Sequence, residues 1–318
     1  MSAEADFPAL VEPHRRELLA HLYRMLGSVH DAGDALQETL LRAWRGLDRF
    51  DGRSSLRGWL YRIATNVALT AIDRRGRRAL PLEGHPADPV APLGEPVAEQ
   101  PWLEPFPDAA LGPEATAEQR ERVELAFVAA LQHLPPNQRA ALLLRDVLAL
   151  SARETADAME TTVASVTSAL QHARTRVAER MPDESQQATL RELGDERLHR
   201  IVAGYTSALE DGDVDAMVEL LAEDVTWSMP PWREWYRGLA DVRAFLADKP
   251  MSQAWRHLPA HANGQLAVGC YMRDEDGTYG ACVVDVIGLR GDRIASVTGF
   301  FLDADRFAAF GLPGVMIS

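Results

Sequence analysis

The chain has 318 residues, of which 47% are hydrophobic, and a net charge of −14. This length and composition allow two or three domains with buried cores. Cys270 and Cys282 are the only cysteines, which excludes a disulfide framework or a zinc cluster, and we predict no cofactor and no metal. The sequence shows no signal peptide and no apolar run of the ~20 residues that a membrane span needs, so we expect a cytoplasmic protein without a membrane partner.

Charge is distributed unevenly along the chain. Residues 14–80 carry a net charge of +6, whereas residues 81–117 carry −7 and contain no lysine or arginine. Residues 118–181 are neutral and residues 182–318 carry −10. Such blocks favour one module that faces nucleic acid and a second module with a different task.

The first block, residues 9–80, is predicted to be helical throughout. Apolar residues recur at helical spacing through Leu18–Leu26 and Ala35–Ala43, and a polar loop follows at Arg49–Ser55. A further helix is predicted from about Leu56 to Asp73. It ends in a cluster of four arginines, namely Arg74, Arg75, Arg77 and Arg78. Residues 81–117 are rich in proline and acidic, which predicts an extended, poorly ordered linker.

The stretch Leu134–Val177 is typical of a DNA-binding helix-turn-helix. A proline pair ends one helix, and Asn137 is predicted to cap the next. Ser151 with Glu154 three residues later is a capping box that opens a short helix. A third helix, capped by Thr161 or Thr162, has an apolar stripe of Val163, Val166, Leu170, Ala173 and Val177. Its other face carries groups suited to bases and phosphates: Ser165, Thr167, Ser168, Gln171, His172, Arg174 and Arg176. The alternative is a helical hairpin with a solvated face, and Met159-Glu160 occupies a turn that often contains glycine.

After a short polar connector at 182–196, the pattern changes to helices at about 198–210 and 213–222, followed by strands. The strand-like runs lie at about 225–229, 253–258, 264–272, 278–289 and 293–301, with a short helix at 241–246. Helices followed by a curved antiparallel sheet predict an α+β cone-shaped domain.

Aromatic and polar residues of this last domain are candidates for a ligand pocket. The apolar candidates are Trp227, Met229, Trp232, Trp235, Tyr236, Trp255 and Phe300. The polar candidates are Tyr205, His261, Asn263, Gln265 and Asp285. The alternative is that the aromatic residues only fill the core. Asp285 lies among β-branched residues, so it is either a pocket group or a surface residue of an edge strand. Cys270 and Cys282 flank the Asp276-Gly277 turn, where they are either small buried residues or a redox pair.

Two helical segments resemble the sigma-70 family of promoter-recognition subunits of bacterial RNA polymerase, in its extracytoplasmic-function group. The resemblance is carried by residues 34–44 (DALQETLLRAW), 56–66 (LRGWLYRIATN), 73–75 (DRR) and the helix-turn-helix. Residues 198–318 are similar to SnoaL-like domains of the ketosteroid-isomerase type. The resemblance implies two all-α sigma domains followed by an α+β cone. Its domains would be region 2 at 7–80, the linker at 81–117, region 4 at 118–181, the connector at 182–196 and the SnoaL-like domain at 197–318.

The resemblance also implies the partners and the residues that contact them. Core RNA polymerase would bind Asp34, Gln37, Glu38, Leu41 and Arg42. The promoter −10 element would be opened and held by Asp51, Arg53, Ser54, Ser55, Arg57, Tyr61, Arg62, Asn66, Arg74 and Arg75. Of the two aromatic residues in that helix, Trp59 is expected to be the buried one. The −35 element would be bound by Thr162, Ser165, Thr167, Ser168, His172, Arg174 and Arg176.

We therefore predict a sigma factor whose SnoaL-like domain modulates its activity through an intramolecular contact with the sigma domains. The opposite charges of the two ends predict that this contact weakens as salt rises. A second hypothesis is a DNA-binding regulator whose cone senses a small molecule of unknown identity. A third is an isomerase-type enzyme on a helical scaffold. We do not expect an enzyme, because the spacing of the acids and histidines singles out no catalytic base.

Overall fold

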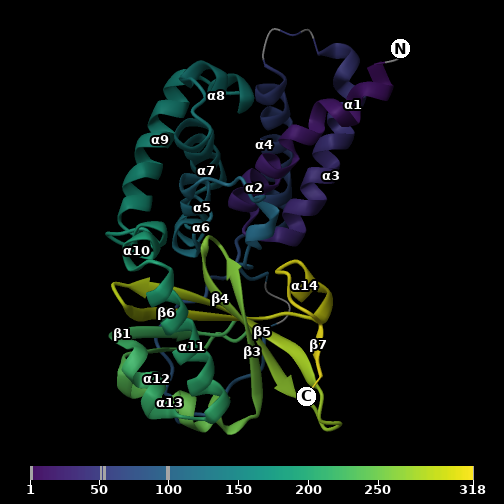
Figure 1. Ribbon diagram of the computed structural model, residues 1–318. Coiled ribbons are helices and arrows are strands. Elements are labelled where there is room, and N and C mark those ends of the chain that lie inside the picture. The colour runs from purple at the N-terminus through teal and green to yellow at the C-terminus, as the bar shows by residue number, and fades with distance from the viewer. Residues whose placement is uncertain (1–2, 51, 53–54, 98–100, 318) are drawn as a thin grey trace. The chain divides into compact units, whose positions relative to one another are not determined.

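The computed structural model describes all residues except 1–2, 51, 53–54, 98–100 and 318, and it divides into two compact units (Figure 1). Unit 1 contains Met1–Arg78, Ala110–Ala115 and Leu125–Pro182. Unit 2 contains Ala79–Ala109, Thr116–Glu124 and Asp183–Ser318.

Unit 1 is built from helices. Its first half contains α1 (Ala3–Val11), η1 (Glu12–His14), α2 (Arg15–Leu26), α3 (Val29–Gly46), η2 (Leu47–Arg49) and α4 (Leu56–Arg75). Gly27 ends α2 with a positive φ of 68°, and the Ser28 hydroxyl accepts the N–H of Asp31 to open α3. Helices α2, α3 and α4 pack around buried side chains that include Leu18, Leu22 and Leu60.

The second half of unit 1 is the predicted helix-turn-helix. It contains α6 (Leu125–Gln132), α7 (Pro136–Leu142) with a π-helical turn (η4, Leu143–Val147), α8 (Ala152–Ala158) and α9 (Val163–Ala178). The predicted capping box of Ser151 and Glu154 is present, and Thr162 caps α9. The predicted cap at Asn137 is wrong, because Pro135 occupies the cap position and the helix begins at Pro136. In the turn before α9, Glu160 adopts a left-handed φ of 51°, where glycine is often found.

The two halves of unit 1 pack against each other through a buried arginine. Arg139 of α7 donates to the carbonyl of Met25 at the end of α2 and to the side chain of Gln132, 2.6 Å away. Gln132 in turn donates to the carbonyl of Arg24 at 3.2 Å. Burial, with Arg77 and Arg78 nearby, lowers the pKa of Arg139 to about 10, so the side chain remains charged at neutral pH. On the surface, Arg62 of α4 bonds Glu160 at 3.1 Å.

Unit 2 combines helices with one sheet. It contains η3 (Asp108–Ala110), which ends in unit 1, then α5 (Ala117–Glu121), α10 (Gln186–Leu193), α11 (Asp195–Asp211), α12 (Val214–Leu220), α13 (Leu239–Asp248), η5 (Pro250–Ser252) and α14 (Ala304–Ala308). Its strands are β1 (Leu221–Ser228), β2 (Trp235–Arg237), β3 (Trp255–Ala262), β4 (Gln265–Arg273), β5 (Tyr279–Arg290), β6 (Arg293–Phe301) and β7 (Val315–Met316). The predicted polar connector at 182–196 contains α10. That helix is opened by Ser185, whose hydroxyl accepts the N–H of Ala188.

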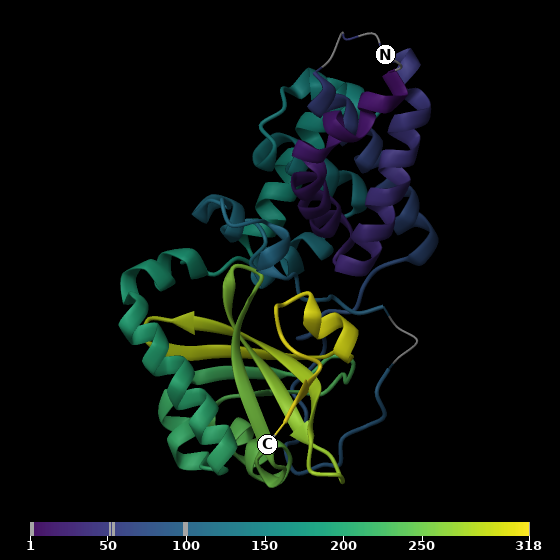
Figure 2. The ribbon, with the colours of Figure 1, turned by 45° about the vertical axis from the view of Figure 1, so that its right-hand side comes forward.

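The strand order is β2-β1-β6-β5-β4-β3, with β7 paired to β5. The sheet is mixed rather than purely antiparallel, because β1 pairs with β6 in parallel. A parallel pair needs a long connection, and strands β2, β3, β4 and β5 lie between these two in the chain. Helices α11, α12 and α13 lie together against one side of the sheet, and α14 contacts β5 (Figures 1 and 2). The core of this unit lies between these three helices and the sheet.

Candidate functional site

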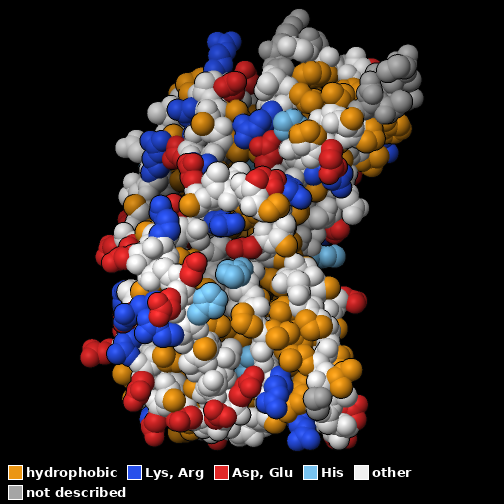
Figure 3. Space-filling view, viewed as in Figure 1, with side chains coloured by type: hydrophobic (Ala, Val, Ile, Leu, Met, Phe, Trp, Pro, Cys, Tyr) orange, Lys and Arg blue, Asp and Glu red, His pale blue; other side chains and the backbone are white. Residues whose placement is uncertain are grey.

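Helix α3 presents the residues predicted to bind polymerase on an exposed face. Asp34, Gln37, Leu41 and Arg42 are exposed, and Glu38 is half-buried and bonded to Arg42 at 2.6 Å. The same face adds a residue that the prediction missed: Trp44 has 45% of its surface exposed, beside Leu41 at 39%. Figure 3 shows hydrophobic side chains gathered on the surface over α1 and α3. An exposed tryptophan beside an exposed leucine marks an interaction surface.

The residues predicted for the −10 element are only partly accessible. Asp51, Arg53 and Ser54 lie outside the described residues. Ser55 caps α4 by accepting the N–H of Gly58, and Arg57 pairs with Glu17 at 2.9 Å. Arg62 and Arg74 are exposed, Asn66 is half-buried, and Arg75 is exposed and pairs with Asp31.

Tyr61 cannot offer its ring to a base, so that prediction is wrong. It is completely buried and packs edge-on against His21, with ring centroids 5.2 Å apart. Burial, together with Arg24 and Arg57, lowers the pKa of His21 to about 3, so the imidazole is neutral. The expected assignment of the two aromatic residues is therefore reversed. Trp59 is half-buried and packs against Phe50, with ring centroids 5.0 Å apart. Trp59 is therefore the accessible aromatic residue of α4.

Helix α9 and its N-cap expose every residue predicted for the −35 element: Thr162, Ser165, Thr167, Ser168, His172, Arg174 and Arg176. Its apolar stripe is buried except for Val163, which is exposed because it lies in the first turn. Arg174 is held by Asp146 through two hydrogen bonds of 2.8 and 2.7 Å, whereas the guanidinium of Arg176 bonds the side-chain amide of Gln138 at 3.2 Å. The outer face of α9 is therefore polar and basic, as direct contact with DNA requires.

We name the chain from Ala79 to Ala109 the tether; it includes most of the segment 81–117 that is predicted to be a poorly ordered linker. Its described residues instead follow the outside of unit 2 (Figure 2). Two tryptophans predicted to line a pocket bind it: the indole N–H groups of Trp235 and Trp232 donate to the carbonyls of Glu83 and Gly94, at 3.2 and 3.0 Å. Four more hydrogen bonds join the tether to the rest of unit 2. The backbone N–H groups of Ala87, Gly94 and Val97 donate to Trp235 O (2.8 Å), Glu234 Oε1 (2.9 Å) and Pro231 O (3.0 Å), and Lys249 Nζ donates to Ala91 O (3.5 Å).

The second part of the tether is fixed at the turn between β3 and β4. Asn263 and Phe106 exchange two hydrogen bonds, of 2.8 and 2.9 Å. The carboxylate of Asp108 accepts the N–H of Gly264 at 2.8 Å. The prediction of disorder failed because composition cannot show that backbone groups between prolines have partners.

Unit 2 also contains Glu124, just before α6. It is fully buried; its Oε1 accepts the N–H of Gln187 at 2.8 Å, and its Oε2 has no hydrogen-bond partner among the described residues. Burial raises the pKa of Glu124 to about 7.

Glu124→Gln is expected to reduce the pH dependence of stability. Because the folded pKa lies above the unfolded value, the carboxyl stabilises the fold below about pH 4.5 and loses that contribution as the pH rises through 7. Between pH 5 and 8, the free energy of unfolding should fall by about 2 kcal/mol more in the parent than in the variant. Urea unfolding at these pH values measures the difference, and parallel pH profiles would contradict the assignment.

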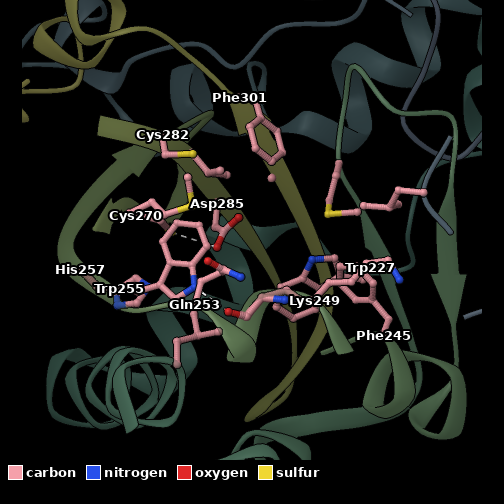
Figure 4. A pocket seen from close by; sticks show the side chains of 17 residues that line it. Trp227, Phe245, Lys249, Gln253, Trp255, His257, Cys270, Cys282, Asp285 and Phe301 are labelled. Carbon is pink, nitrogen blue, oxygen red and sulfur yellow. Dashed lines mark hydrogen bonds between the residues drawn. The ribbon is translucent and has the colours of Figure 1, made fainter. Parts of the chain in front are cut away.

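Unit 2 contains a cavity of about 210 Å³ between the helices and the sheet. Figure 4 shows Cys270, Cys282 and Asp285 gathered on one side of it, with Trp227 and Phe245 on the other. The lining is mostly apolar and consists of Leu93, Leu209, Trp227, Met229, Phe245, Lys249, Pro250, Gln253, Trp255, His257, Cys270, Met272, Cys282, Val283, Asp285, Gly299 and Phe301.

Of the twelve pocket candidates, Trp227, Met229, Trp255 and Asp285 line this cavity. Tyr205 and Tyr236 are buried behind the lining. Trp232 and Trp235 bond the tether instead. Two more candidates lie outside the cavity lining. His261 is exposed at the end of β3. Phe300 faces away from the cavity, because side chains alternate along a strand and its neighbours Gly299 and Phe301 line the cavity. Asn263 bonds the tether, and Gln265 bonds the carbonyl of Ile287.

Asp285 lies on the central strand β5 and is only 6% exposed. Its Oδ2 accepts hydrogen bonds from the Tyr205 hydroxyl at 2.8 Å and from the Cys270 thiol at 3.2 Å. Burial raises the pKa of Asp285, and these two bonds oppose the rise. Both cysteines are free thiols that line the cavity.

Across the described ranges, no helix combines the length and the apolar character that crossing a membrane requires.

Comparison with known proteins accounts for both units. Residues 10–78 match the family model for sigma-70 region 2, residues 124–177 match sigma-70 region 4, and residues 202–297 match the SnoaL-like domain. The chain is 44% identical to the ECF RNA polymerase sigma factor SigG of Mycobacterium tuberculosis, over 97% of this chain and 84% of the relative. It is 29% identical to SigJ of the same species, over 70% of this chain and 64% of that relative. The crystal structure of SigJ, an extracytoplasmic function sigma factor, superposes with a TM-score of 0.60 and 22% identity, and the match covers 96% of this chain and 99% of SigJ.

Proposed function

The chain belongs to the extracytoplasmic-function group of the sigma-70 family, and we propose that its SnoaL-like domain regulates it by holding the tether between regions 2 and 4. As a sigma factor, it directs RNA polymerase to promoters. The observation that carries the proposal is the set of hydrogen bonds from Trp232, Trp235 and Glu234 to the tether.

The distance between the two promoter elements explains why holding the tether would lower initiation. The −10 and −35 elements lie about 25 base pairs apart, which is about 85 Å of B-form DNA. Regions 2 and 4 form one compact unit, so they must separate to contact both elements. A released segment of residues 79–124 reaches about 150 Å when fully extended. Since a held tether cannot extend in this way, holding it opposes the separation and lowers initiation.

The tether hold is tested by removing two hydrogen-bond donors without removing the rings. Trp232→Phe combined with Trp235→Phe is expected to raise amide exchange in segment 83–97 by about 10- to 30-fold, since each bond contributes about 1 kcal/mol. Trp255→Phe is the matched control, because its indole N–H bonds Pro250 within the domain, at 2.6 Å. Equal exchange in the parent, the double variant and the control would contradict the hold.

Regions 2 and 4 have separate tasks in this proposal. Region 2 binds core polymerase through α3 and the −10 element through α4, where Trp59 replaces Tyr61 as the stacking residue. Region 4 binds the −35 element through the outer face of α9. The protein acts in the cytoplasm, and the opposite charges of its two ends favour a salt-sensitive intramolecular contact between the SnoaL-like and sigma domains.

Two variants of α9 separate phosphate contacts from base contacts. Arg176→Gln is expected to reduce the salt dependence of promoter binding by the holoenzyme, lowering the slope of log K against log salt by about 0.9 on every promoter. Ser168→Ala is expected to change promoter preference and leave that slope unchanged, because it removes a base contact. Titrations at several salt concentrations measure both. If Arg176→Gln left the slope unchanged, the phosphate assignment would be wrong.

We also propose that the chain is not an enzyme. The histidine and the lysine that line the cavity are already engaged, His257 with Glu210 at 3.3 Å and Lys249 with Asp248 at 2.6 Å. The alternative for the SnoaL-like domain is ligand sensing, which the apolar lining of the cavity favours over isomerase chemistry. The alternative for the whole chain is a ligand-sensing regulator that does not bind polymerase. This alternative does not explain the exposed hydrophobic residues on α3.

A further inference from the structure

The cavity in unit 2 has the composition of a site for an apolar ring. Its walls include the aromatic residues Trp227, Phe245, Trp255 and Phe301. An apolar cavity of about 150 Å³ holds benzene. A cavity of about 210 Å³ therefore suits a single ring or two fused rings.

One polar atom is available inside these walls. Both hydrogen bonds that Asp285 accepts go to Oδ2, and its Oδ1 receives none from any residue that the structure describes. A side chain at Gly299 would come within 2.8 Å of Oδ1, so the glycine leaves this oxygen uncovered on the cavity side. A hydroxyl group suits the position, because it donates to a carboxylate and accepts from a carboxylic acid.

The tether completes the wall of the cavity. Leu93 is half-buried, lines the cavity and packs against the core of the SnoaL-like domain. Lys249 also lines the cavity. Its ammonium group donates to the carbonyl of Ala91, which precedes Leu93 by two residues in the tether. The cavity therefore exists with the tether in place, and releasing the tether would remove one of its walls.

We propose that this cavity binds a small molecule of one or two fused apolar rings with one hydroxyl group, and that the bound molecule strengthens the hold on the tether through Leu93. The inference rests on the tether hold proposed above. A ligand that contacts Leu93 binds the held state more tightly than the released state, so it shifts the population towards the held state. The two equilibria are linked, so the effect is reciprocal. If Leu93→Ala lowers the affinity for the ligand by some factor, it lowers the ligand's effect on the tether equilibrium by the same factor.

The test uses 2-naphthol as the probe and naphthalene as the probe without a hydroxyl group, both added to the full-length protein. Lys249 is the only lysine in the sequence, so ¹³C-methylation of amino groups gives one side-chain resonance, located at the cavity. The shift of this resonance measures binding, and amide exchange of segment 83–97 measures the hold. Leu93→Ala is compared with Val90→Ala, a control in the same tether whose side chain is 76% exposed and not part of the lining.

We expect 2-naphthol to shift the Lys249 resonance to saturation and to slow exchange of segment 83–97 at least fivefold. Naphthalene should bind about tenfold more weakly, because it makes no hydrogen bond to Asp285. Asp285→Leu should remove that difference between the probes, and Asp285→Asn should retain part of it. Leu93→Ala should lower the affinity for 2-naphthol about fivefold and abolish the slowing of amide exchange in segment 83–97. Val90→Ala should behave like the parent in both measurements.

Each other outcome overturns a separate statement. If 2-naphthol at millimolar concentration leaves Lys249 unshifted, the cavity is not such a site. If the resonance shifts but exchange is unchanged or faster, the coupling through Leu93 is wrong. If segment 83–97 is unprotected before any probe is added, the tether hold itself fails, and this is a failure of the proposed function rather than of the ligand site.

Discussion

Trp44→Ala is expected to weaken the binding of this sigma factor to core RNA polymerase by about 30- to 1,000-fold. The side chain is 45% exposed on α3, beside Leu41 at 39%, and both lie on the face that carries Asp34 and Gln37. Exposed tryptophans that become fully buried in a complex contribute about 2–4 kcal/mol to binding. Titration of core polymerase with labelled protein measures the loss.

Folding should be unaffected by this change, because a surface side chain contributes little to stability. Ile317→Ala is the matched control: it removes a side chain that is 90% exposed and lies in the SnoaL-like domain, so it should bind core polymerase like the parent. Unchanged affinity in Trp44→Ala would remove α3 from the polymerase interface.

Arg139→Ala is expected to lower the free energy of unfolding by about 3 kcal/mol, the largest stability effect that we predict. The buried guanidinium joins region 4 to the carbonyl of Met25 in region 2, and it also bonds the carbonyls of Gln132 and Leu134, at 3.2 and 3.3 Å. Its removal leaves these acceptors without a donor in a place that water does not reach. Urea unfolding of the full chain measures the loss.

Arg62→Ala is the comparison for this variant. It breaks the exposed pair with Glu160 that also joins the two regions, and an exposed pair contributes less than about 1 kcal/mol. If Arg139→Ala cost no more than Arg62→Ala, the packing of regions 2 and 4 would not depend on the buried arginine.

The sequence predicted the elements whose signals are local. The stripe of Val166, Leu170, Ala173 and Val177 and the capping box at Ser151 each depend on spacing within one helix, and the structure confirms both. The position of Asp285 among β-branched residues left two alternatives. The strand order decides between them, because β5 lies inside the sheet and its acid faces the cavity.

The errors have a common physical origin in contacts between distant segments. The choice between Trp59 and Tyr61 depended on what packs against α4, and His21 of α2 does so. Trp232 and Trp235 were predicted to line a pocket, and only the path of the tether explains their indole hydrogen bonds. A motif identifies a family through residues close in sequence, whereas a proline-rich segment carries no pattern that specifies its partners.

Run-off transcription with core polymerase tests the central claim most directly. The parent chain is compared with the Trp232→Phe/Trp235→Phe variant, on promoters selected with the protein itself, and Trp255→Phe serves as the control. We expect both the parent and the control to initiate, and the double variant to initiate several-fold more, because its tether is released. If the double variant releases its tether, as measured by amide exchange, and transcribes no more than the parent, the tether does not restrain this sigma factor.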